Sequence, residues 1–352
     1  MVEKLRFAIV GCGVIGPLHA EAITSLPDAE LVAVADVDQE KAQKLAEKYH
    51  VKAYSSFQDM FAAEKLDVIN ICTPSGMHGE HACAAMRAGY HTIVEKPMEI
   101  TRERLDEMLQ VQRETGRKLA VISQHRFDEG TATVHRLLQE GEFGRLVLGN
   151  AAIPWWRSQK YYDSGAWRGT WALDGGGVLM NQSIHSIDVL QWLMGPVKSI
   201  YAYTDTLVHS METEDVAAAV LRFANGAVGT ISATTGAYPG ATTRIEIFGD
   251  KGSAIIENDQ LEYIHLARDD AEEIGAYGGG AATKKGAAGK AAGAADPAAI
   301  QSNTHAMQIA DMIRAIKEDG TPLVDGSAAR HPVEIILGIY ESARTQKEVI
   351  LS

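Results

Sequence analysis

A glycine-rich turn near the N-terminus sets strict limits on the local fold. The sequence Gly11-Cys12-Gly13-Val14-Ile15-Gly16 follows an apolar run at residues 7–10 and precedes an amphipathic segment at residues 17–26. In a G-x-G-x-x-G turn the first glycine permits a tight bend, the second lets a pyrophosphate approach the backbone, and the third allows a helix to pack closely on a strand. The spacing therefore predicts a strand, a phosphate-binding turn and a helix.

Apolar strands and amphipathic helices continue to alternate up to about residue 125. Repeated β-α-β units with short links predict a parallel, doubly wound sheet with right-handed crossovers. We therefore expect residues 1–125 to form an α/β domain. Its further strands are predicted at residues 31–35, 68–72, 91–94 and 118–122, and its further helices at 39–49 and 102–115.

The pattern changes after residue 127. A helix at residues 130–139 leads into long segments in which apolar and polar residues alternate, at 146–154, 197–205, 217–223, 227–233 and 244–248. Such alternation, with turns such as Ala224-Asn225-Gly226, predicts an open, mainly antiparallel sheet. Helices are expected at 177–193, 305–318 and 332–345. Residues 126–352 are thus expected to form an α+β domain for substrate binding and oligomerisation, whose closing helix can pack back on the first domain.

Residues 275–299 consist almost entirely of Gly, Ala and Lys. This composition is typical of a flexible linker. The alternative is a mobile flap over a binding site, because long loops in compact enzymes often act as lids. The sequence leaves both interpretations open.

Composition narrows the class of protein and the compartment. The net charge of −13 argues against a nucleic-acid partner, which would need basic clusters. No segment is long and apolar enough to span a membrane, and the apolar run that follows the first six residues is too short for a signal peptide. The cysteines Cys12, Cys72 and Cys83 lack the spacing of metal ligands and are expected to be buried thiols, so we predict a cytoplasmic protein without a bound metal.

A carboxylate follows the second predicted strand. Asp36 lies 20 residues beyond Gly16. At that position a carboxylate accepts hydrogen bonds from the adenosine ribose hydroxyls of a dinucleotide and repels a 2′-phosphate. Val37 follows, where a site for NADP would favour Arg or Ser. NAD is therefore predicted in preference to NADP.

Glu95-Lys96-Pro97 comes directly after the strand predicted at residues 91–94. Ligands of open α/β sheets bind beyond the carboxyl ends of the strands, which is where Lys96 falls. A lysine there can orient a hydroxyl, stabilise a developing alkoxide or carry a proton. Taken alone, the motif is more typical of a surface lysine beside the start of a helix.

A second candidate site follows Gly175-Gly176-Gly177. Asn181, His185 and Asp188 are spaced by four and three residues, which places them on one face of a predicted helix. Histidine titrates near neutral pH, so His185 can accept a hydroxyl proton, and Asn181 can orient that hydroxyl. Asp188 can hold the imidazole tautomer or cap local structure. The structural alternative for His185 is a hydrogen-bonded core residue.

These motifs together resemble the glucose-fructose oxidoreductase/inositol dehydrogenase/rhizopine-catabolism family, written Gfo/Idh/MocA. The resemblance rests on the glycine-rich turn, Cys72-Thr73-Pro74 with His78, Glu95-Lys96-Pro97 and the Gly-Gly-Gly…Asn-x-x-x-His segment. It implies a Rossmann domain followed by an α+β domain, bound NAD(P), and hydride exchange with a sugar or polyol. It also implies oligomers, dimers or tetramers, built through the open sheet.

The resemblance assigns roles by position. It makes Lys96 and His185 the catalytic pair, and it places Thr73, Pro74, His78 and Glu95 along the cofactor. Many family members have Asp where this chain has Asn181, so an Asp–His proton relay is in doubt. The Asn form is similar to members that act on nucleotide-linked amino sugars and on some glycosides.

Four of the five tryptophans lie between residues 155 and 171. Aromatic faces stack on pyranose rings, and Arg and Lys reach hydroxyls or carboxylates, although a core or interface cluster would have the same composition. We expect Trp156 and Arg168 to contact the substrate, and Trp167 with Arg168 to lie near the cofactor. In Gln124-His125-Arg126, Gln124 is expected near the cofactor and Arg126 near the substrate, and His305 is expected to project toward the same cleft.

The resulting hypothesis is reversible NAD-dependent oxidation of a secondary hydroxyl on a sugar, glycoside, cyclitol or nucleotide-sugar. His185 would act as the general base, Lys96 as its electrostatic and proton-relay partner, and Asn181 as the positioning group. Two alternatives are a redox-assisted glycosidase that retains NAD and a non-catalytic sensor of NAD. The residue types select neither the sugar, nor the reacting carbon, nor the physiological direction.

Overall fold

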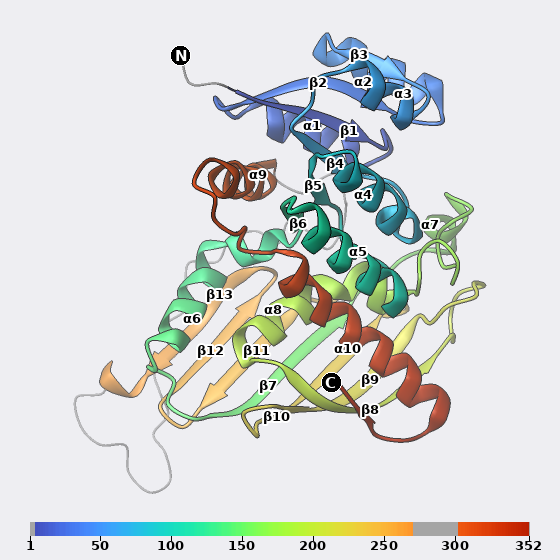
Figure 1. Cartoon of the computed structure of the whole chain (residues 1–352). Coiled ribbons are helices and arrows are strands. Elements are labelled where there is room, and N and C mark those ends of the chain that lie inside the picture. The colour runs from blue at the N-terminus through green and yellow to red at the C-terminus, as the bar shows by residue number, and fades with distance from the viewer. Residues whose placement is uncertain (1–3, 270–301, 352) are drawn as a thin grey trace, which may run out of the picture. The chain divides into compact units, whose positions relative to one another are not determined.

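Six short strands form one parallel sheet in the computed structural model, which describes residues 4–269 and 302–351 (Figure 1). The strand order is β3-β2-β1-β4-β5-β6, so the direction of winding reverses between β1 and β4. Ligands of such sheets bind outside the carboxyl ends of the strands at that point. The strands are β1 (Leu5–Val10), β2 (Ala29–Ala35), β3 (Lys52–Tyr54), β4 (Val68–Ile71), β5 (His91–Val94) and β6 (Leu119–Val121).

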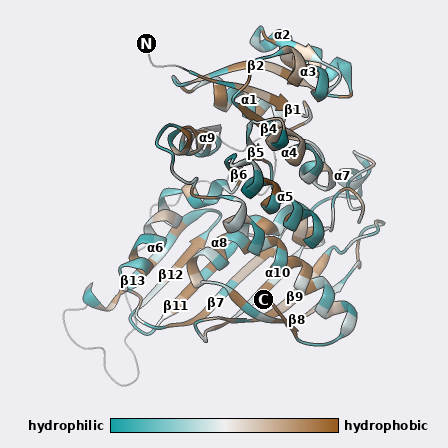
Figure 2. Ribbon diagram, in the orientation of Figure 1, coloured by the Kyte–Doolittle hydropathy of each residue, from teal (hydrophilic) through white to brown (hydrophobic). Residues whose placement is uncertain are grey.

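Burial explains why these strands form the centre of a layered domain. Phe7, Ile9, Ile69 and Ile93 are fully or almost fully buried, as expected for parallel strands covered on both faces. Figure 2 shows the hydropathy of the residues along the chain. The helices that follow the strands are α1 (Gly16–Thr24), α2 (Gln39–Tyr49), α3 (Phe57–Ala63), α4 (His78–Arg87) and α5 (Arg102–Thr115). Three of these helices begin after a side chain that caps them: Asp38, Ser56 and Thr101 accept hydrogen bonds from backbone N–H groups in the first turns of α2, α3 and α5.

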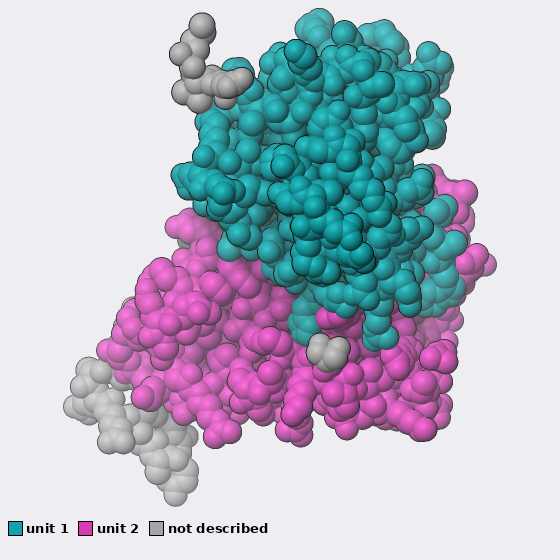
Figure 3. All heavy atoms as spheres, viewed as in Figure 1, with its two compact units in different colours: residues 1–124, 171–175, 301–333 teal, residues 125–170, 176–300, 334–352 magenta. Residues whose placement is uncertain are grey.

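The chain divides into two compact units, coloured separately in Figure 3. The first comprises residues 1–124, 171–175 and 301–333, and the second comprises 125–170, 176–300 and 334–352. The sequence division at 125/126 was too simple, because two later segments belong to the first unit. Helix α9 (Ser302–Lys317) carries Ile309, Met312 and Ile313 into the core around Phe7, so a segment distant in sequence completes that core.

The second unit is built on an eight-stranded sheet with the order β13-β12-β11-β7-β10-β9-β8-β14. Among the strands described for this sheet, only β7 and β10 pair in parallel, which confirms the predicted open, mainly antiparallel sheet. The strands are β7 (Leu146–Pro154), β8 (Val197–Asp205), β9 (Val216–Phe223), β10 (Val228–Thr234), β11 (Arg244–Gly249), β12 (Gly252–Glu257), β13 (Gln260–Leu266) and β14 (Val349–Ile350).

Side chains of this sheet alternate between a buried and an exposed face. In β9 and β10 every second residue is buried, which is the pattern that the sequence alternation predicts. The helices of this part of the chain are α6 (Glu129–Gln139), the short α7 (Gln159–Asp163), α8 (Ile184–Met194) and α10 (Gly326–Thr345), which runs from the first unit into the second. A π-helical segment, Val178–Ser183, precedes α8.

The segment at residues 275–299, interpreted from its composition as a linker or a lid, lies outside the described residues. Within residues 4–269 and 302–351, no helix has both the length and the apolar character needed to cross a bilayer.

Candidate active site

The glycine-rich loop has the geometry that its spacing predicts. Gly11 has φ +100°, and a Cβ on it would lie 2.5 Å from the carbonyl oxygen of Cys72. A Cβ on Gly16 would lie 2.4 Å from the carbonyl oxygen of Gly11, at the start of α1. A Cβ on Gly13, in contrast, would meet no described atom within 4 Å. The loop is therefore tight at its first and third glycines and open at the second, where a dinucleotide phosphate approaches the backbone.

Asp36 lies at the end of β2, directly beside this loop. Its Oδ2 accepts from the backbone N–H of Cys12 at 2.6 Å, and its Oδ1 accepts from that of Asp38 at 2.8 Å. The neighbouring Val37 is 93% exposed and offers no positive charge for a 2′-phosphate. These contacts fit an adenosine ribose carrying free hydroxyls.

Thr73 and Pro74 follow β4, and His78 begins α4. His78 is buried, with Nε2 2.8 Å from the carbonyl oxygen of Thr73 and Nδ1 2.7 Å from that of Pro97. His78 was expected to lie along the cofactor, which stays a prediction. Its ring bridges two backbone segments, and burial lowers its pKa. It therefore holds the loop after β4 against the loop after β5.

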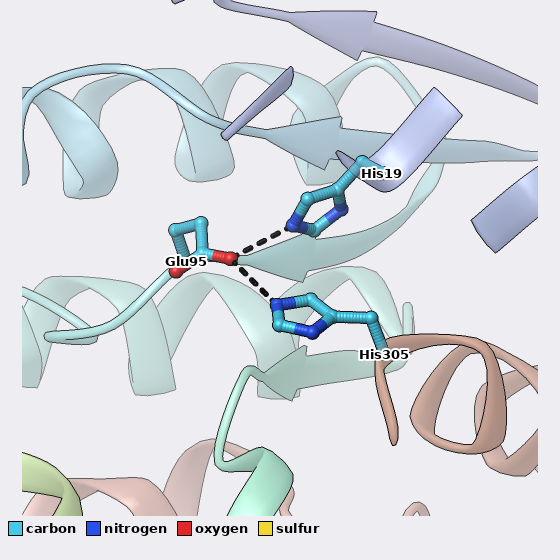
Figure 4. Close-up of side chains that lie close together, drawn as sticks. All are labelled: His19, Glu95 and His305. Carbon is cyan, nitrogen blue, oxygen red and sulfur yellow. Dashed lines mark hydrogen bonds and ion pairs between the residues drawn. The ribbon is translucent and has the colours of Figure 1, made fainter. Parts of the chain in front are cut away.

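Glu95 is also buried rather than turned outward. Its Oε1 lies 2.8 Å from Nε2 of His19 and 3.5 Å from Nε2 of His305 (Figure 4). Asn70 donates its side-chain N–H to Nδ1 of His19 at 2.8 Å, which leaves the proton on Nε2 for the bond to Glu95. Burial alone raises the pKa of Glu95, but the two imidazoles outweigh it and hold that pKa well below the ordinary value.

His305 was expected to project toward the ligand cleft, and Glu95 to contact the cofactor. The two side chains are turned toward each other inside the first unit, and their predicted contacts with a ligand stay predictions. His19 was missed by the sequence analysis, because a histidine one turn into α1 carries no motif of its own. The three side chains connect α1, the end of β5 and α9 through hydrogen bonds.

Lys96 lies two residues beyond the end of β5, at the carboxyl edge of the first sheet. Its backbone N–H donates to Oε2 of Glu95 at 3.1 Å, so the buried carboxylate also fixes the backbone of Lys96. Gln124 follows β6 at the same edge and is buried. Both residues therefore lie where ligands of a doubly wound sheet bind.

Asn181 and His185 belong to the second unit. Asn181 lies in the π-helical segment and His185 in the first turn of α8, so a regular α-helical face does not join them as the spacing predicted. Single π-helical turns are frequent at functional sites. Glu214 anchors this turn by accepting from the backbone N–H of Gly177 at 3.0 Å and of Leu179 at 2.9 Å. Burial raises the pKa of Glu214 to about 7, although these bonds oppose the change.

Tyr161 joins Asn181 to Arg168 through hydrogen bonds. The sequence pattern did not single out this tyrosine. Its hydroxyl donates to Oδ1 of Asn181 at 3.5 Å and accepts from Arg168 at 2.7 Å and from Gln182 at 3.1 Å. The guanidinium of Arg168 lies 4.4 Å from the ring centres of both Tyr161 and Trp167. Arg168 and Trp167 thus reach the vicinity of Asn181 through Tyr161, as stacked cation–π neighbours.

His185 has a second histidine as its neighbour. The ring centres of His125 and His185 are 5.3 Å apart, and the rings are perpendicular. Nδ1 of His125 lies 2.7 Å from Oδ2 of Asp128 and 3.4 Å from Oδ1 of Asp259. Burial lowers the pKa of His125, but the carboxylates of Asp259 and Asp128 outweigh that effect and raise it to about 9.

Arg126 and Asp188 form a buried ion pair in the second unit. Nε of Arg126 donates to Oδ2 of Asp188 at 2.8 Å, and a second guanidinium nitrogen donates to the other carboxylate oxygen. The guanidinium also lies 5.3 Å from the ring centre of Trp192. Arg126 thus has a structural partner, and its predicted contact with substrate stays a prediction. Asp188 bonds this arginine through both carboxylate oxygens.

Trp156 lies in a different group from Tyr161. It is 38% exposed, and its ring centre is 5.5 Å from that of Tyr238, which is also exposed. The described contacts place this pair beside the backbone bridge between Trp156 and Gly236. They do not bring Trp156 to Asn181, so its predicted contact with substrate stays a prediction.

Comparison with known proteins covers both units. A family model described as an oxidoreductase family with an NAD-binding Rossmann fold matches residues 5–123. A second, described as the GFO/IDH/MocA C-terminal domain, matches residues 131–255. The crystal structure of the WlbA dehydrogenase from Bordetella pertussis, in complex with NADH and UDP-GlcNAcA, is 32% identical, covers 99% of each chain and has a TM-score of 0.86.

Other relatives act on smaller molecules. The myo-inositol 2-dehydrogenase of Thermotoga maritima is 28% identical over 72% of this chain and 75% of its own length. The D-glucoside 3-dehydrogenase of Escherichia coli is 34% identical over 57% of this chain and 58% of its own length.

Proposed function

Because this chain belongs to the Gfo/Idh/MocA family of NAD-binding oxidoreductases, we propose that it transfers hydride between NAD and a secondary alcohol of a sugar. The observation that supports this most directly is the glycine loop, tight at Gly11 and Gly16 and open at Gly13, with Asp36 beside it. NAD, when bound, supplies the acceptor of the hydride.

The roles of the reacting side chains follow from their chemistry. His185 accepts the hydroxyl proton as hydride leaves the same carbon, and in the reverse direction it returns that proton. Lys96 stabilises the developing negative charge on the oxygen and relays the proton. Asn181, held by Tyr161, orients the hydroxyl. Asn181 cannot share a proton with His185, so the base works without an aspartate partner at that position.

We further propose that the substrate carries a negative charge, as a nucleotide-linked or acidic sugar does. Arg168 contacts the hydroxyl of Tyr161, and the guanidinium of Arg157 lies 5.4 Å from the centre of the same ring. Two cations next to the segment that orients Asn181 favour a carboxylate or phosphate. The WlbA dehydrogenase, whose structure contains UDP-GlcNAcA, supports the same class. The relatives reported above are dehydrogenases, so the redox-assisted glycosidase is not favoured.

The test is the kinetics of Lys96→Met and His185→Ala, with Lys198→Met as the matched control. The Lys198 side chain is exposed on β8. We expect each site variant to lose roughly 100-fold or more in kcat, as for removal of a general acid–base group, while NADH binding is retained. Undiminished activity in both variants would contradict the assignment.

We also propose that the protein is a cytoplasmic homo-oligomer. We expect a homo-dimer or homo-tetramer that uses the exposed face of the large sheet, because Tyr203, Val220 and Val228 are apolar and exposed there. Light scattering after size-exclusion chromatography measures the mass directly, and a monomer would contradict this expectation. Three free, buried thiols, Cys12, Cys72 and Cys83, support the expected cytoplasmic location.

A further inference from the structure

The neighbourhood of His185 contains a charged group that the proposed reaction does not use. His125 is the second residue of the short helix Gln124–Phe127, and its ring meets that of His185 edge to face. The two carboxylates on its other side come from different elements: Asp128 precedes α6, and Asp259 lies in the turn between β12 and β13. His125 is thus held between two carboxylates and one imidazole.

The turn that carries Asp259 is formed by local sequence. Asn258 and Asp259 both have positive φ, +46° and +63°, and they connect β12 to β13 as a two-residue loop. Asn and Asp are among the residues that tolerate this conformation, which is typical of a type I′ hairpin turn. The hairpin therefore presents the Asp259 carboxylate at a fixed place, 3.4 Å from the His125 nitrogen.

We propose that His125 is a positioning residue, held as an imidazolium by Asp128 and Asp259, that orients the ring of His185 and keeps His185 in the neutral form that accepts a proton. The inference rests on the proposed role of His185 as the base. It gives this chain a substitute for the aspartate partner that Asn181 removes, but one that acts by charge and packing rather than by sharing a proton.

The direction of the effect follows from the nearest charge. A cation in ring contact disfavours a second positive charge on His185, so it favours the unprotonated base. The two carboxylates oppose this effect, and together with the imidazolium they give the group one net negative charge; the imidazolium is the member whose ring meets that of His185. Compared with an uncharged ring at position 125, the imidazolium therefore disfavours protonation of His185.

Other charged groups on the elements around α8 are paired. Arg126 and Asp188 neutralise each other in a buried ion pair. Glu246 of β11 bonds to Arg244, and His135 of α6 stacks on Trp192, with ring centres 3.8 Å apart. On the side of the π-helical turn, Arg168 bonds to Tyr161, and Glu214 bonds to backbone. Among these described groups, His125 is the one in ring contact with His185.

The experiment compares the pH profile of kcat/KM for sugar oxidation in three variants. His125→Phe keeps an aromatic ring against His185 and removes the charge, whereas His125→Lys keeps the charge and removes the ring. In His125→Phe we expect the acidic limb of the profile to move to higher pH by about one unit. We expect it to stay near the wild-type position in His125→Lys. In Asp259→Asn we expect it to move to lower pH, because a negative charge is lost while His125 keeps its shorter bond to Asp128. The dissociation constant of NADH serves as the control for folding.

An unchanged limb in His125→Phe, or equal movement in the Phe and Lys variants, would overturn the proposal. A readout independent of activity separates it from the proposed function. In NMR spectra, the titration midpoint of the His185 ring protons should rise in His125→Phe, even when no sugar is turned over. If His185→Ala remains active while this midpoint moves, the role of His185 as the base is wrong, but its coupling to His125 stands.

Discussion

Nε2 of His19 lies 2.8 Å from Oε1 of Glu95, joining the first helix to the residue before Lys96. The two residues are 76 positions apart in sequence, and both are buried. A carboxylate inside a domain is stable only when hydrogen-bond donors compensate its charge. Here the donors are His19, His305 and the backbone of Lys96. The first unit therefore fixes the position of Lys96 partly through this buried network.

Removal of the His19 donor should destabilise the protein measurably. In His19→Leu, the Glu95 carboxylate loses its shortest hydrogen bond, and we expect the free energy of unfolding to fall by about 1.5–3 kcal/mol, the usual contribution of a bond to a charged group. Differential scanning calorimetry measures the change. His50→Leu, at an exposed position that ends α2, is the matched control. Equal unfolding temperatures for His19→Leu and wild type would show that the network contributes nothing to stability.

Tyr161 provides a test of the proposed substrate side. Tyr161→Phe removes the hydroxyl that bonds Asn181, Arg168 and Gln182, so we expect kcat/KM to fall about 10-fold, as one hydrogen bond of 1–1.5 kcal/mol implies. The control is Tyr162→Phe, because Tyr162 bonds to Thr235 instead. A loss of kcat/KM in the control alone would contradict the assignment of Tyr161.

The Arg126–Asp188 pair predicts a large effect on stability from a small change. Asp188→Asn leaves a buried guanidinium without its counter-charge, which costs about 3–5 kcal/mol. We expect a clear fall in unfolding temperature, and no such fall in Asp163→Asn on the exposed helix α7. If Asp188→Asn were as stable as wild type but bound the sugar weakly, Arg126 would be a substrate residue after all.

Asp36 is expected to set the choice between NAD and NADP. Asp36→Asn removes the charge that repels a 2′-phosphate and weakens the bond to the Cys12 backbone, so affinity for NADH should fall and affinity for NADPH should rise. We expect the ratio of the two dissociation constants, measured by nucleotide fluorescence, to change about 10-fold or more. Asp38→Asn, in the same loop, is the control, and an unchanged ratio in Asp36→Asn is the contrary result.

Local sequence predicted the parts of the site that depend on neighbouring residues. The roles of Gly11, Gly13 and Gly16 follow from backbone geometry within one turn, and Asp36 follows from its place at a strand end. The large sheet was predictable because its side chains alternate. In each case the relevant physics acts over a few residues.

Burial and long-range pairing were not visible in the sequence. His78 and Arg126 have side chains that suit ligand binding, and only the structure shows them buried against Pro97 and Asp188. Glu214 stabilises a turn 37 residues before it in the chain, a relationship that no spacing rule reports. Polar residues that a motif assigns to a ligand can thus serve the fold instead.

The most direct measurement is the absorbance of NADH during incubation of the protein with NAD and a panel of sugars. The panel includes UDP-GlcNAcA, free uronates, inositols and simple glycosides, and NADP is tested in parallel. We expect NADH to form in the presence of substrate, most strongly with a negatively charged sugar and NAD. We expect this formation of NADH to be lost in His185→Ala. Demonstrable NAD binding with no NADH from any member of the panel, and no consumption of NADH with the corresponding ketones, would contradict the proposed reaction.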